Sequence, residues 1–344
     1  MIETETVKKA AATNNSVQRV PKKSLAEIRQ PISGNLRAFN KFFKESLRTD
    51  VFLLNQVLSY MLVTRGKQMR PMLVFLSARI FGEINDRSYT AAAMVELLHS
   101  ATLIHDDVVD NADRRRGFFS VNKLWKSKVS VLLGDFLLSK GLLVALEKDE
   151  FELLKVLSTA VKKMSEGELR QLKATKLLNM NEEKYLQIIS EKTASLLAAC
   201  TECGAICTTE DPEARRIMRD IGVNMGIAFQ IRDDLFDYEQ TNSDKSKGND
   251  IIERKITLPL IAALDRSGYF ERRGIKQKFR RKSKNREQIS EIIQFVKEKD
   301  GVDYARAKMQ HYADTAIELL HQLPESEPRY DLEDFIRFVI TRTK

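Results

Sequence analysis

Apolar residues recur at intervals of three and four along nearly the whole sequence from Ser24 onward, which is the periodicity of amphipathic helices. No stretch alternates apolar and polar residues for long enough to predict a convincing strand. The pattern predicts helices over residues 51–62, 72–81, 89–110, 129–146, 151–177, 182–207, 212–238 and 258–264, with breaks at 82–88, 111–120, 208–211 and 241–255.

Glycine and proline are scarce: 14 Gly and 7 Pro make up about 6% of the 344 residues, where average usage gives roughly 12%. Because both residues break helices, their scarcity favours long helices over a β architecture rich in turns. The hydrophobic fraction of 43% can bury a large core and excludes a wholly disordered chain. We therefore expect an all-α protein with a flexible polar tail over residues 1–24 and one helical domain over residues 25–344.

The three cysteines favour a reducing compartment, because an odd and small number does not fit a fold built on disulfides. Cys200, Cys203 and Cys207 share one face of a predicted helix, which favours buried thiols over metal or redox chemistry. No signal peptide is visible, and charged residues interrupt each apolar run before it reaches about 18 residues. We expect a cytoplasmic protein without a membrane-spanning helix.

The net charge of +9 is concentrated in one segment. Residues 266–286 carry ten Lys and Arg against one acid, which accounts for the whole excess. A solvated loop is the favoured interpretation, and peripheral contact with an anionic membrane stays open as an alternative. We expect no binding to nucleic acid, because neither interleaved aromatic residues nor zinc-ligand spacing accompanies the charge.

An acidic DDxxD motif ends an otherwise apolar helical segment at Asp106, Asp107 and Asp110. At about 100° per residue these three carboxylates crowd one side of the helix. Their repulsion is costly unless cations lie between them, and oxygen ligands point to a hard cation, Mg²⁺ first. Taken alone, this motif is explained better by a solvated acidic helix end than by a metal site.

A second motif with the same spacing, Asp233, Asp234 and Asp237, ends another apolar segment. Two such clusters can face each other across a bundle core and hold Mg²⁺ and a diphosphate between them. Such a site favours breakage of a C–O bond to diphosphate, since Mg²⁺ neutralises the leaving group. Cations that accompany the motifs are Lys67 and Arg70 upstream, Arg115 and Arg116 after the first, and Lys245 and Lys255 after the second.

These motifs, in this order, resemble those of the trans-isoprenyl diphosphate synthases, from about residue 40 to the C-terminus. Further matches are residues 134–135, 192–193 and 255–259, and residues 95–105 resemble the long-chain polyprenyl diphosphate synthases within that family. The resemblance implies an isoprenoid synthase-type, single-domain helical bundle with a central active-site cavity. It also implies two or three Mg²⁺ per active site and a homodimer.

The resemblance assigns roles residue by residue. Mg²⁺ and the allylic diphosphate would be held by Asp106, Asp107, Asp110, Asp233, Asp234 and Asp237. The allylic diphosphate would also contact Arg115, Lys192, Lys245 and Lys255. Isopentenyl diphosphate would contact Lys67, Arg70, His99 and Arg116. Oxygens of Thr193 and Gln230 would stabilise the allylic carbocation, and no side chain is needed as a general base because the released pyrophosphate takes the proton.

The function that the resemblance implies is Mg²⁺-dependent, head-to-tail condensation of isopentenyl diphosphate onto an allylic primer, farnesyl or geranylgeranyl diphosphate, with a quinone side chain as the usual destination. A short-chain (C15–C20) prenyl diphosphate synthase is the alternative. A terpene cyclase shares the bundle and the first motif, but it usually lacks a second DDxxD and does not need Lys67, Arg70 and Arg116. A subunit without enzymatic activity would be free to lose the six aspartates.

The length of the product is predicted from the helix that ends in the first motif. Thr102 and Ala101, four and five residues before Asp106, are small, and Val95 lies deeper on nearly the same line. A growing chain that extends along this line is not stopped early by a bulky side chain. Together with the family resemblance, this predicts a product of C30 or longer, with C40 to C55 as the expected range.

Overall fold

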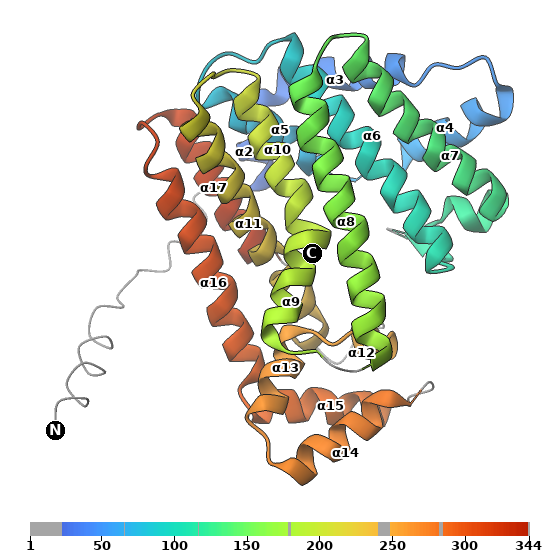
Figure 1. The fold of residues 1–344 in the computed structure, drawn as a ribbon, viewed down its shortest axis with the longest axis vertical. Coiled ribbons are helices and arrows are strands. Elements are labelled where there is room, and N and C mark those ends of the chain that lie inside the picture. Colours follow the sequence, from blue (N-terminus) through green and yellow to red (C-terminus); the bar gives the residue numbers. More distant parts are fainter. Residues whose placement is uncertain are drawn as a thin grey trace.

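The computed structural model describes residues 23–64, 66–115, 117–177, 180–239, 248–281 and 285–342, and it is a bundle of helices (Figure 1). The first half contains α2 (Leu25–Arg29), η1 (Gln30–Ile32), α3 (Ser33–Ser46), α4 (Phe52–Val63), α5 (Met69–Arg79), α6 (Asp86–Val109), β1 (Arg114–Arg115), β2 (Phe118–Phe119), α7 (Val121–Leu146) and α8 (Phe151–Leu177). The second half contains α9 (Glu182–Ile189), η2 (Ser190–Ala194), α10 (Ser195–Ile206), α11 (Pro212–Glu239), α12 (Asn249–Ile252), α13 (Leu258–Asp265), α14 (Tyr269–Arg280), α15 (Arg286–Glu298), α16 (Gly301–Leu320) and α17 (Glu327–Thr341). The predicted all-α class is confirmed.

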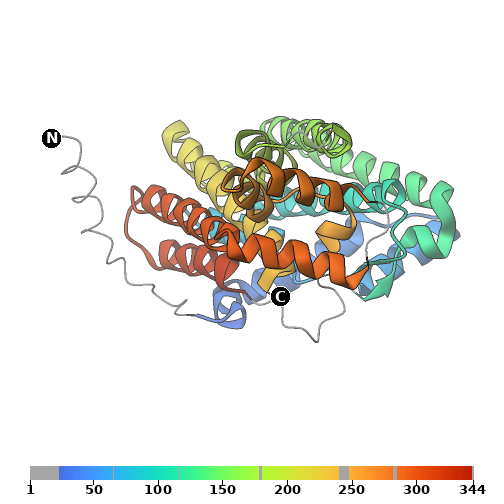
Figure 2. The ribbon, with the colours of Figure 1, turned by 90° about the horizontal axis from the view of Figure 1, so that it is seen from below.

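The centre of the bundle is built from α5, α6, α10 and α11, whose apolar residues are buried over much of their circumference. Helix α6 packs along α7, and α11 packs between α10 and α16. Helices α14 and α15 lie across one end of this bundle, as the two perpendicular views show (Figures 1 and 2). Helices α6 and α11 therefore run through the core, and their C-terminal ends carry the two acidic motifs.

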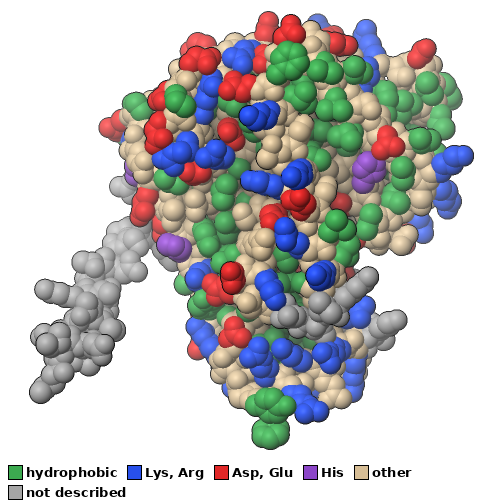
Figure 3. All heavy atoms as spheres, in the orientation of Figure 1, with side chains coloured by type: hydrophobic (Ala, Val, Ile, Leu, Met, Phe, Trp, Pro, Cys, Tyr) green, Lys and Arg blue, Asp and Glu red, His purple; other side chains and the backbone are tan. Residues whose placement is uncertain are grey.

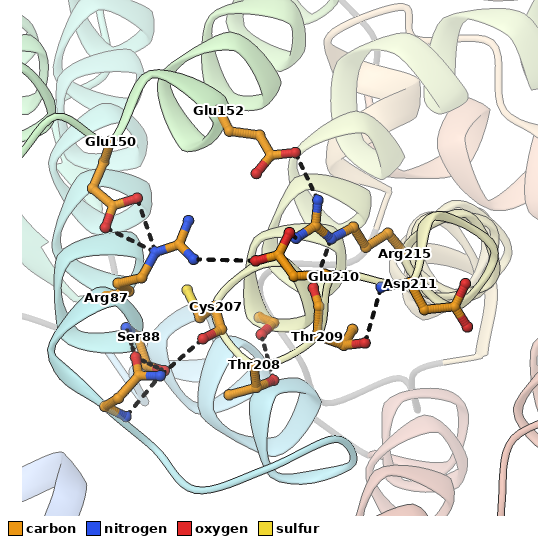
Figure 4. Close-up of polar contacts among 12 residues, drawn as sticks. Arg87, Ser88, Glu150, Glu152, Cys207, Thr208, Thr209, Glu210, Asp211 and Arg215 are labelled. Carbon is orange, nitrogen blue, oxygen red and sulfur yellow. Dashed lines mark hydrogen bonds and ion pairs between the residues drawn. The ribbon is translucent and has the colours of Figure 1, made fainter.

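A polar network fixes the opposite end of the bundle, where α6 and α11 begin (Figure 4). Arg87 binds Glu150 with distances of 2.9 and 3.2 Å, and Arg215 binds Glu152 at 2.8 Å and Glu210 at 2.7 Å. Asn85 caps α6 and donates to the carbonyl of Cys207 at 2.8 Å. These contacts join the starts of α6, α8 and α11 to the end of α10, so the interior is closed there by polar groups.

Three local features differ from the sequence predictions. The predicted break at 111–120 contains a two-stranded antiparallel hairpin, β1 and β2, with Gly117 at a φ of 83°. The predicted helix over 182–207 is interrupted by η2, a π-helical turn. The favoured interpretation of residues 266–286 as a solvated loop is wrong: residues 269–280 form α14, because Ile275 and Phe279, four residues apart, give this basic segment one buried side.

The cysteine prediction is confirmed: Cys200, Cys203 and Cys207 are buried, reduced and on one side of α10. The expectation of no membrane-spanning helix is neither confirmed nor contradicted: α7 is long and apolar enough to cross a membrane by length and composition, but one such helix is weak evidence. Helix α7 instead packs along α6, with a kink at Lys126, and leaves one face exposed. Buried core helices of globular proteins are also long and apolar, so these two properties do not distinguish a core helix from a membrane-spanning one.

Candidate active site

The two aspartate clusters lie at the C-terminal ends of the two core helices. In α6, Asp107 is buried, Asp106 is half-buried and Asp110 is the exposed C-cap. In α11, Asp234 is buried, and Asp233 and Asp237 are half-buried. Both helices are apolar up to this point, so packing of the core brings carboxylates to the same end of the bundle.

The π-helical turn η2 carries Lys192 and Thr193 and packs directly against α11. A Cβ added at Gly226 would lie 2.5 Å from the Cα of Ala194, so only glycine allows this approach. The approach brings the hydroxyl of Thr193 within 2.7 Å of Oε1 of Gln230, to which it donates. π-Helical turns inside longer helices occur frequently at functional sites.

A chain of hydrogen bonds continues from Gln230 into the second aspartate cluster. Nε2 of Gln230 donates to Oδ1 of Asp234 at 2.9 Å, and the hydroxyl of Tyr185 donates to Oδ2 of the same carboxylate at 2.7 Å. Both oxygens of Asp234 are thereby oriented. Tyr185 was not predicted as a site residue; its position seven residues before Lys192, two helical turns away on the same face, was a usable signal.

The electrostatics of the clusters suit cations. Burial raises the pKa of Asp106, Asp233, Asp234 and Asp237 above their usual value, and nearby carboxylates add to the rise at Asp106, Asp234 and Asp237. Asp250, beside them, shows the same upward shift from burial and from Asp234 and Asp237. The acids are oxygen donors, which fits Mg²⁺. Among the residues that the structure describes, no three acids, His or Cys converge closely enough to hold a metal alone, so a bound ion would need further oxygens from water or diphosphate.

Two lysines connect the clusters. Lys192 attracts Asp106 electrostatically and contacts Glu168 and, at 3.3 Å, Oε1 of Gln171. Lys255 binds Glu253 at 2.6 Å. Burial opposes its charge, but Glu253, Asp250 and Asp110 outweigh burial and raise the pKa of Lys255. Lys192 thus lies near Asp106, and Lys255 lies near Asp110 and Asp250. Both lysines could bind a diphosphate held at the aspartates.

The predicted cationic residues line two separate cavities. The larger, of about 750 Å³, is lined by Lys67, Arg70, His99, Asp107 and Arg115 among others. The smaller, of about 120 Å³, is lined by Lys192, Thr193, Gln230, Asp234, Tyr185, Asp250 and Lys255 among others. Lys67, Arg70 and His99, assigned together from the sequence, share one cavity, and Lys192 and Lys255 share the other. Arg116 and Lys245 lie outside the described residues.

Arg115 lines the larger cavity, whereas Lys192 and Lys255, with which the sequence grouped it, line the smaller one. Its Nη2 and Nε lie 2.6 and 2.8 Å from Oδ1 of Asp107, so the hairpin β1–β2 folds it back onto the first motif. Arg115 therefore contacts the first aspartate cluster and also lines the cavity that contains Lys67 and Arg70.

Arg342 is a residue of the site that the sequence did not indicate. It ion-pairs with Asp233, stacks 4.1 Å from the ring centroid of Phe229 and lines the larger cavity. Burial outweighs the attraction of Asp233 and lowers the pKa of Arg342 below that of an ordinary guanidinium. Nothing in the local spacing near the C-terminus signals this contact, since it depends on how α17 packs against α11.

The three residues expected to govern product length lie along α6. Val95 and Ala101 are buried, and Thr102 is half-buried with its hydroxyl donated to the carbonyl of His99 at 2.9 Å. They follow the line from Asp106 toward the polar network at the start of α6. Their effect on product length stays a prediction.

Comparison with known proteins adds the following. Residues 51–296 match the family model for polyprenyl synthetase. The chain is 34% identical to an all-trans-nonaprenyl-diphosphate synthase (geranyl-diphosphate specific) of Rhodobacter capsulatus, over 92% of this chain and 97% of that one, and 32% identical to an octaprenyl diphosphate synthase of Escherichia coli, over 93% and 100%. A crystal structure of a polyprenyl synthase from Caulobacter crescentus, complexed with calcium and isoprenyl diphosphate, superposes with a TM-score of 0.86 at 32% identity, covering 94% of this chain and 100% of that one.

Proposed function

Because this chain belongs to the polyprenyl synthetase family, we propose that it is an all-trans long-chain polyprenyl diphosphate synthase that adds isopentenyl diphosphate units to an allylic diphosphate primer. It is a prenyltransferase. The observation that carries the proposal is the division of the cations between two cavities: Lys192 and Lys255 line one, and Lys67, Arg70 and His99 line the other. Such a division fits two diphosphates, one that leaves and one that stays.

We assign the allylic diphosphate to the side of Lys192, Lys255 and Asp234, and isopentenyl diphosphate to the cavity of Lys67, Arg70 and His99. The aspartates of both motifs would hold Mg²⁺, which would neutralise the charge that develops on the leaving diphosphate. The bonds from Gln230 and Tyr185 hold both oxygens of Asp234 in fixed directions. Lys192 and Lys255 add positive charge on the same side.

The condensation needs one bond broken, one formed and one proton removed. The allylic C–O bond breaks and its electron pair leaves with the diphosphate; the double bond of isopentenyl diphosphate then attacks the allylic carbon. Thr193 and Gln230, hydrogen-bonded to each other at 2.7 Å, line the same cavity, and their remaining oxygen lone pairs would stabilise this positive charge. The proton lost from the new chain goes to the released pyrophosphate.

Two alternatives are weaker. A terpene cyclase has no use for a second diphosphate, so the cavity that gathers Lys67, Arg70 and His99 would be unexplained. A short-chain synthase would use the same chemistry, but it would need a bulky side chain close to Asp106, where α6 has Ala101 and Thr102. The relatives named nonaprenyl and octaprenyl diphosphate synthase support the long chain. Farnesyl or geranylgeranyl diphosphate as primer, a quinone side chain as end use and the cytoplasm as location belong to the same proposal.

We also propose a homodimer formed through α7. Its exposed face carries Leu132 (60% exposed), Leu143 (46%) and Leu146 (48%), and the neighbouring α4 adds Phe52 (75%). An apolar face of this extent on a helix that packs in the bundle on its other side is typical of an interface. We propose a second copy of the chain as the partner, because in a dimer with a two-fold axis the same surface of each subunit forms the interface. Leu132→Glu together with Leu143→Glu should yield a monomer in sedimentation equilibrium.

Product analysis tests the proposed function. The protein is incubated with labelled isopentenyl diphosphate, farnesyl diphosphate and Mg²⁺, and the dephosphorylated products are sized by chromatography. We expect linear all-trans products of C30 or longer. Products that end at about C20, or cyclic hydrocarbons formed without isopentenyl diphosphate, would contradict the proposal.

A further inference from the structure

Helix α14 presents a basic and aromatic surface at the end of the molecule (Figures 1 and 3). Its buried side consists of Ile275 and Phe279. The opposite side begins with Phe270, whose side chain is 86% exposed, and continues with Arg273, Gln277 and Arg280, all exposed, at helical intervals of three and four. Because Phe270 is so exposed, packing within this chain does not explain a large aromatic side chain at this position.

Phe270 is not an isolated apolar residue on the surface. Tyr269, 68% exposed, lies against it in an edge-to-face contact with 5.5 Å between ring centroids. Together the two rings form an aromatic tip at the first turn of α14. The space-filling view shows hydrophobic side chains among Lys and Arg at this end of the molecule (Figure 3). Aromatic residues next to cations are the composition of surfaces that enter the interfacial layer of a bilayer.

The cations of this surface are only partly neutralised. Lys278 binds Glu291 at 2.8 Å and Arg272 lies 3.5 Å from Asp265. Within the described ranges, no carboxylate forms an ion pair with Arg273, Lys276 or Arg280. Burial lowers the pKa of Lys276, and Arg272 and Arg280 lower it further, which shows how strongly positive charge is concentrated here.

Helix α14 also lies close to the catalytic cavity. Met180 and Ile256 line both the small cavity beside Asp234 and a second small cavity under α14, which Arg272 and Ile275 complete. Met180 and Ile256 thus separate the cavity under the buried side of α14 from the proposed allylic site. A membrane bound at α14 would lie near the place where an apolar, bilayer-soluble product is made.

We propose that α14 is a docking surface for an anionic lipid bilayer, in which Tyr269 and Phe270 enter the interface while Arg273, Lys276 and Arg280 bind lipid phosphates. A membrane explains the surface better than a nucleic acid, because the aromatic rings are gathered at one tip and are not interleaved with the cations along the helix. The proposal does not depend on the enzymatic activity, since binding is measured without substrate.

The test is sedimentation of the full-length protein with vesicles of equal parts phosphatidylcholine and phosphatidylglycerol, compared with pure phosphatidylcholine. We expect binding to the anionic vesicles alone. The triple variant Arg273→Gln, Lys276→Gln, Arg280→Gln should bind them about a hundredfold more weakly, since each basic residue near an anionic surface contributes about a factor of five. Phe270→Ser should also weaken binding to the anionic vesicles, although it removes no charge.

Matched controls exist on α8, toward the other end of the bundle. Lys155→Gln, Lys162→Gln, Lys163→Gln removes the same number of exposed positive charges, and Phe151→Ser removes an exposed aromatic side chain. Both controls should bind as the unmodified protein does. The proposal is overturned if the α8 triple variant loses as much binding as the α14 variant, if no vesicle is bound, or if duplex DNA competes for the surface while Phe270→Ser has no effect.

Discussion

The hydroxyl of Tyr185 donates a 2.7 Å hydrogen bond to Oδ2 of Asp234, and both side chains are buried. Burial raises the pKa of Tyr185 well above its ordinary value, and Asp234 raises it further, so the phenol keeps its proton and stays a donor. Asp234 is the most deeply buried aspartate of the second motif, and Gln230 orients its other oxygen. Tyr185 is therefore a positioning residue for the second aspartate cluster.

Replacement of Tyr185 by Phe should lower kcat by about tenfold and raise the Mg²⁺ concentration needed for half-maximal rate, because one hydrogen bond to a charged group contributes about 1.5–3 kcal/mol. The ring packing is retained, so the unfolding midpoint should change little. Tyr304→Phe is the matched control, since Tyr304 donates a similar bond, 2.6 Å, to Glu182 away from the aspartates. An unchanged Mg²⁺ requirement in Tyr185→Phe would mean that Asp234 does not need this bond.

The two cavities predict opposite effects on the two Michaelis constants. Arg70→Gln should raise KM for isopentenyl diphosphate by roughly 10- to 100-fold and leave KM for the allylic primer nearly unchanged, because a charge-assisted contact to one diphosphate is lost. Lys192→Gln should do the reverse. Steady-state kinetics with each substrate varied in turn measures both KM values. Equal effects on both KM values in both variants would show that the two substrates are wrongly assigned to the cavities.

Product length should respond to bulk at Thr102. Thr102→Phe should shorten the product to about C15–C20 without slowing the first condensation, since the side chain lies one helical turn before Asp106 on the same side. Thr102→Val keeps the volume and removes the hydroxyl, so it should make the full-length product. Chromatography of the products distinguishes these outcomes, and a full-length product from Thr102→Phe would show that the chain grows along another face.

Glu239 should make the fold sensitive to acid. It accepts hydrogen bonds from Arg232 at 2.6 Å and Arg306 at 2.7 Å and so joins α11 to α16. Burial alone would raise its pKa, but these two bonds outweigh burial and the pKa is lowered from its ordinary value of 4.5. The stabilisation is present above about pH 4.5 and is lost as the pH falls through the lowered pKa.

Glu239→Gln should therefore lower the free energy of unfolding by about 1–3 kcal/mol near neutral pH. The difference from the unmodified protein should shrink below about pH 4.5, as urea unfolding at several pH values would show. Glu213→Gln is the control: Glu213 is exposed and pairs with Arg216 within one helix, where such pairs contribute little. A constant difference at all pH values would exclude the ionic contribution.

The sequence predicted the part of the site that depends on local geometry. The spacing of Asp106, Asp107 and Asp110, repeated in the second motif, places carboxylates at helix ends, because a period of 3.6 residues fixes their directions. It did not predict η2, since the residues around Lys192 follow an uninterrupted helical pattern. It did not predict the contact of Arg342 with Asp233 either, because that contact depends on the packing of α17 and α11, far apart along the chain.

Residues 266–286 show a further limit. Repulsion among ten cations favours a solvated loop when composition alone is considered. Two buried residues, Ile275 and Phe279, are enough to fold part of the segment as α14 against α13, where they line a small cavity with Leu260 and Leu264. In this segment the spacing of a few apolar residues predicts the helix better than the local charge does.

The central claim is that the two aspartate clusters act on one diphosphate as a unit. Turnover of Asp106→Asn, Asp233→Asn and the double variant tests it, with Asp113→Asn, an exposed acid in the adjacent hairpin, as the control. Each single variant should lose a factor on the order of 10²–10³ or more. Since groups that act together are not additive, the double variant should lose little beyond the worse single variant. Losses that multiply in the double variant would show that the clusters work independently, and near-normal turnover in either single variant would contradict the account.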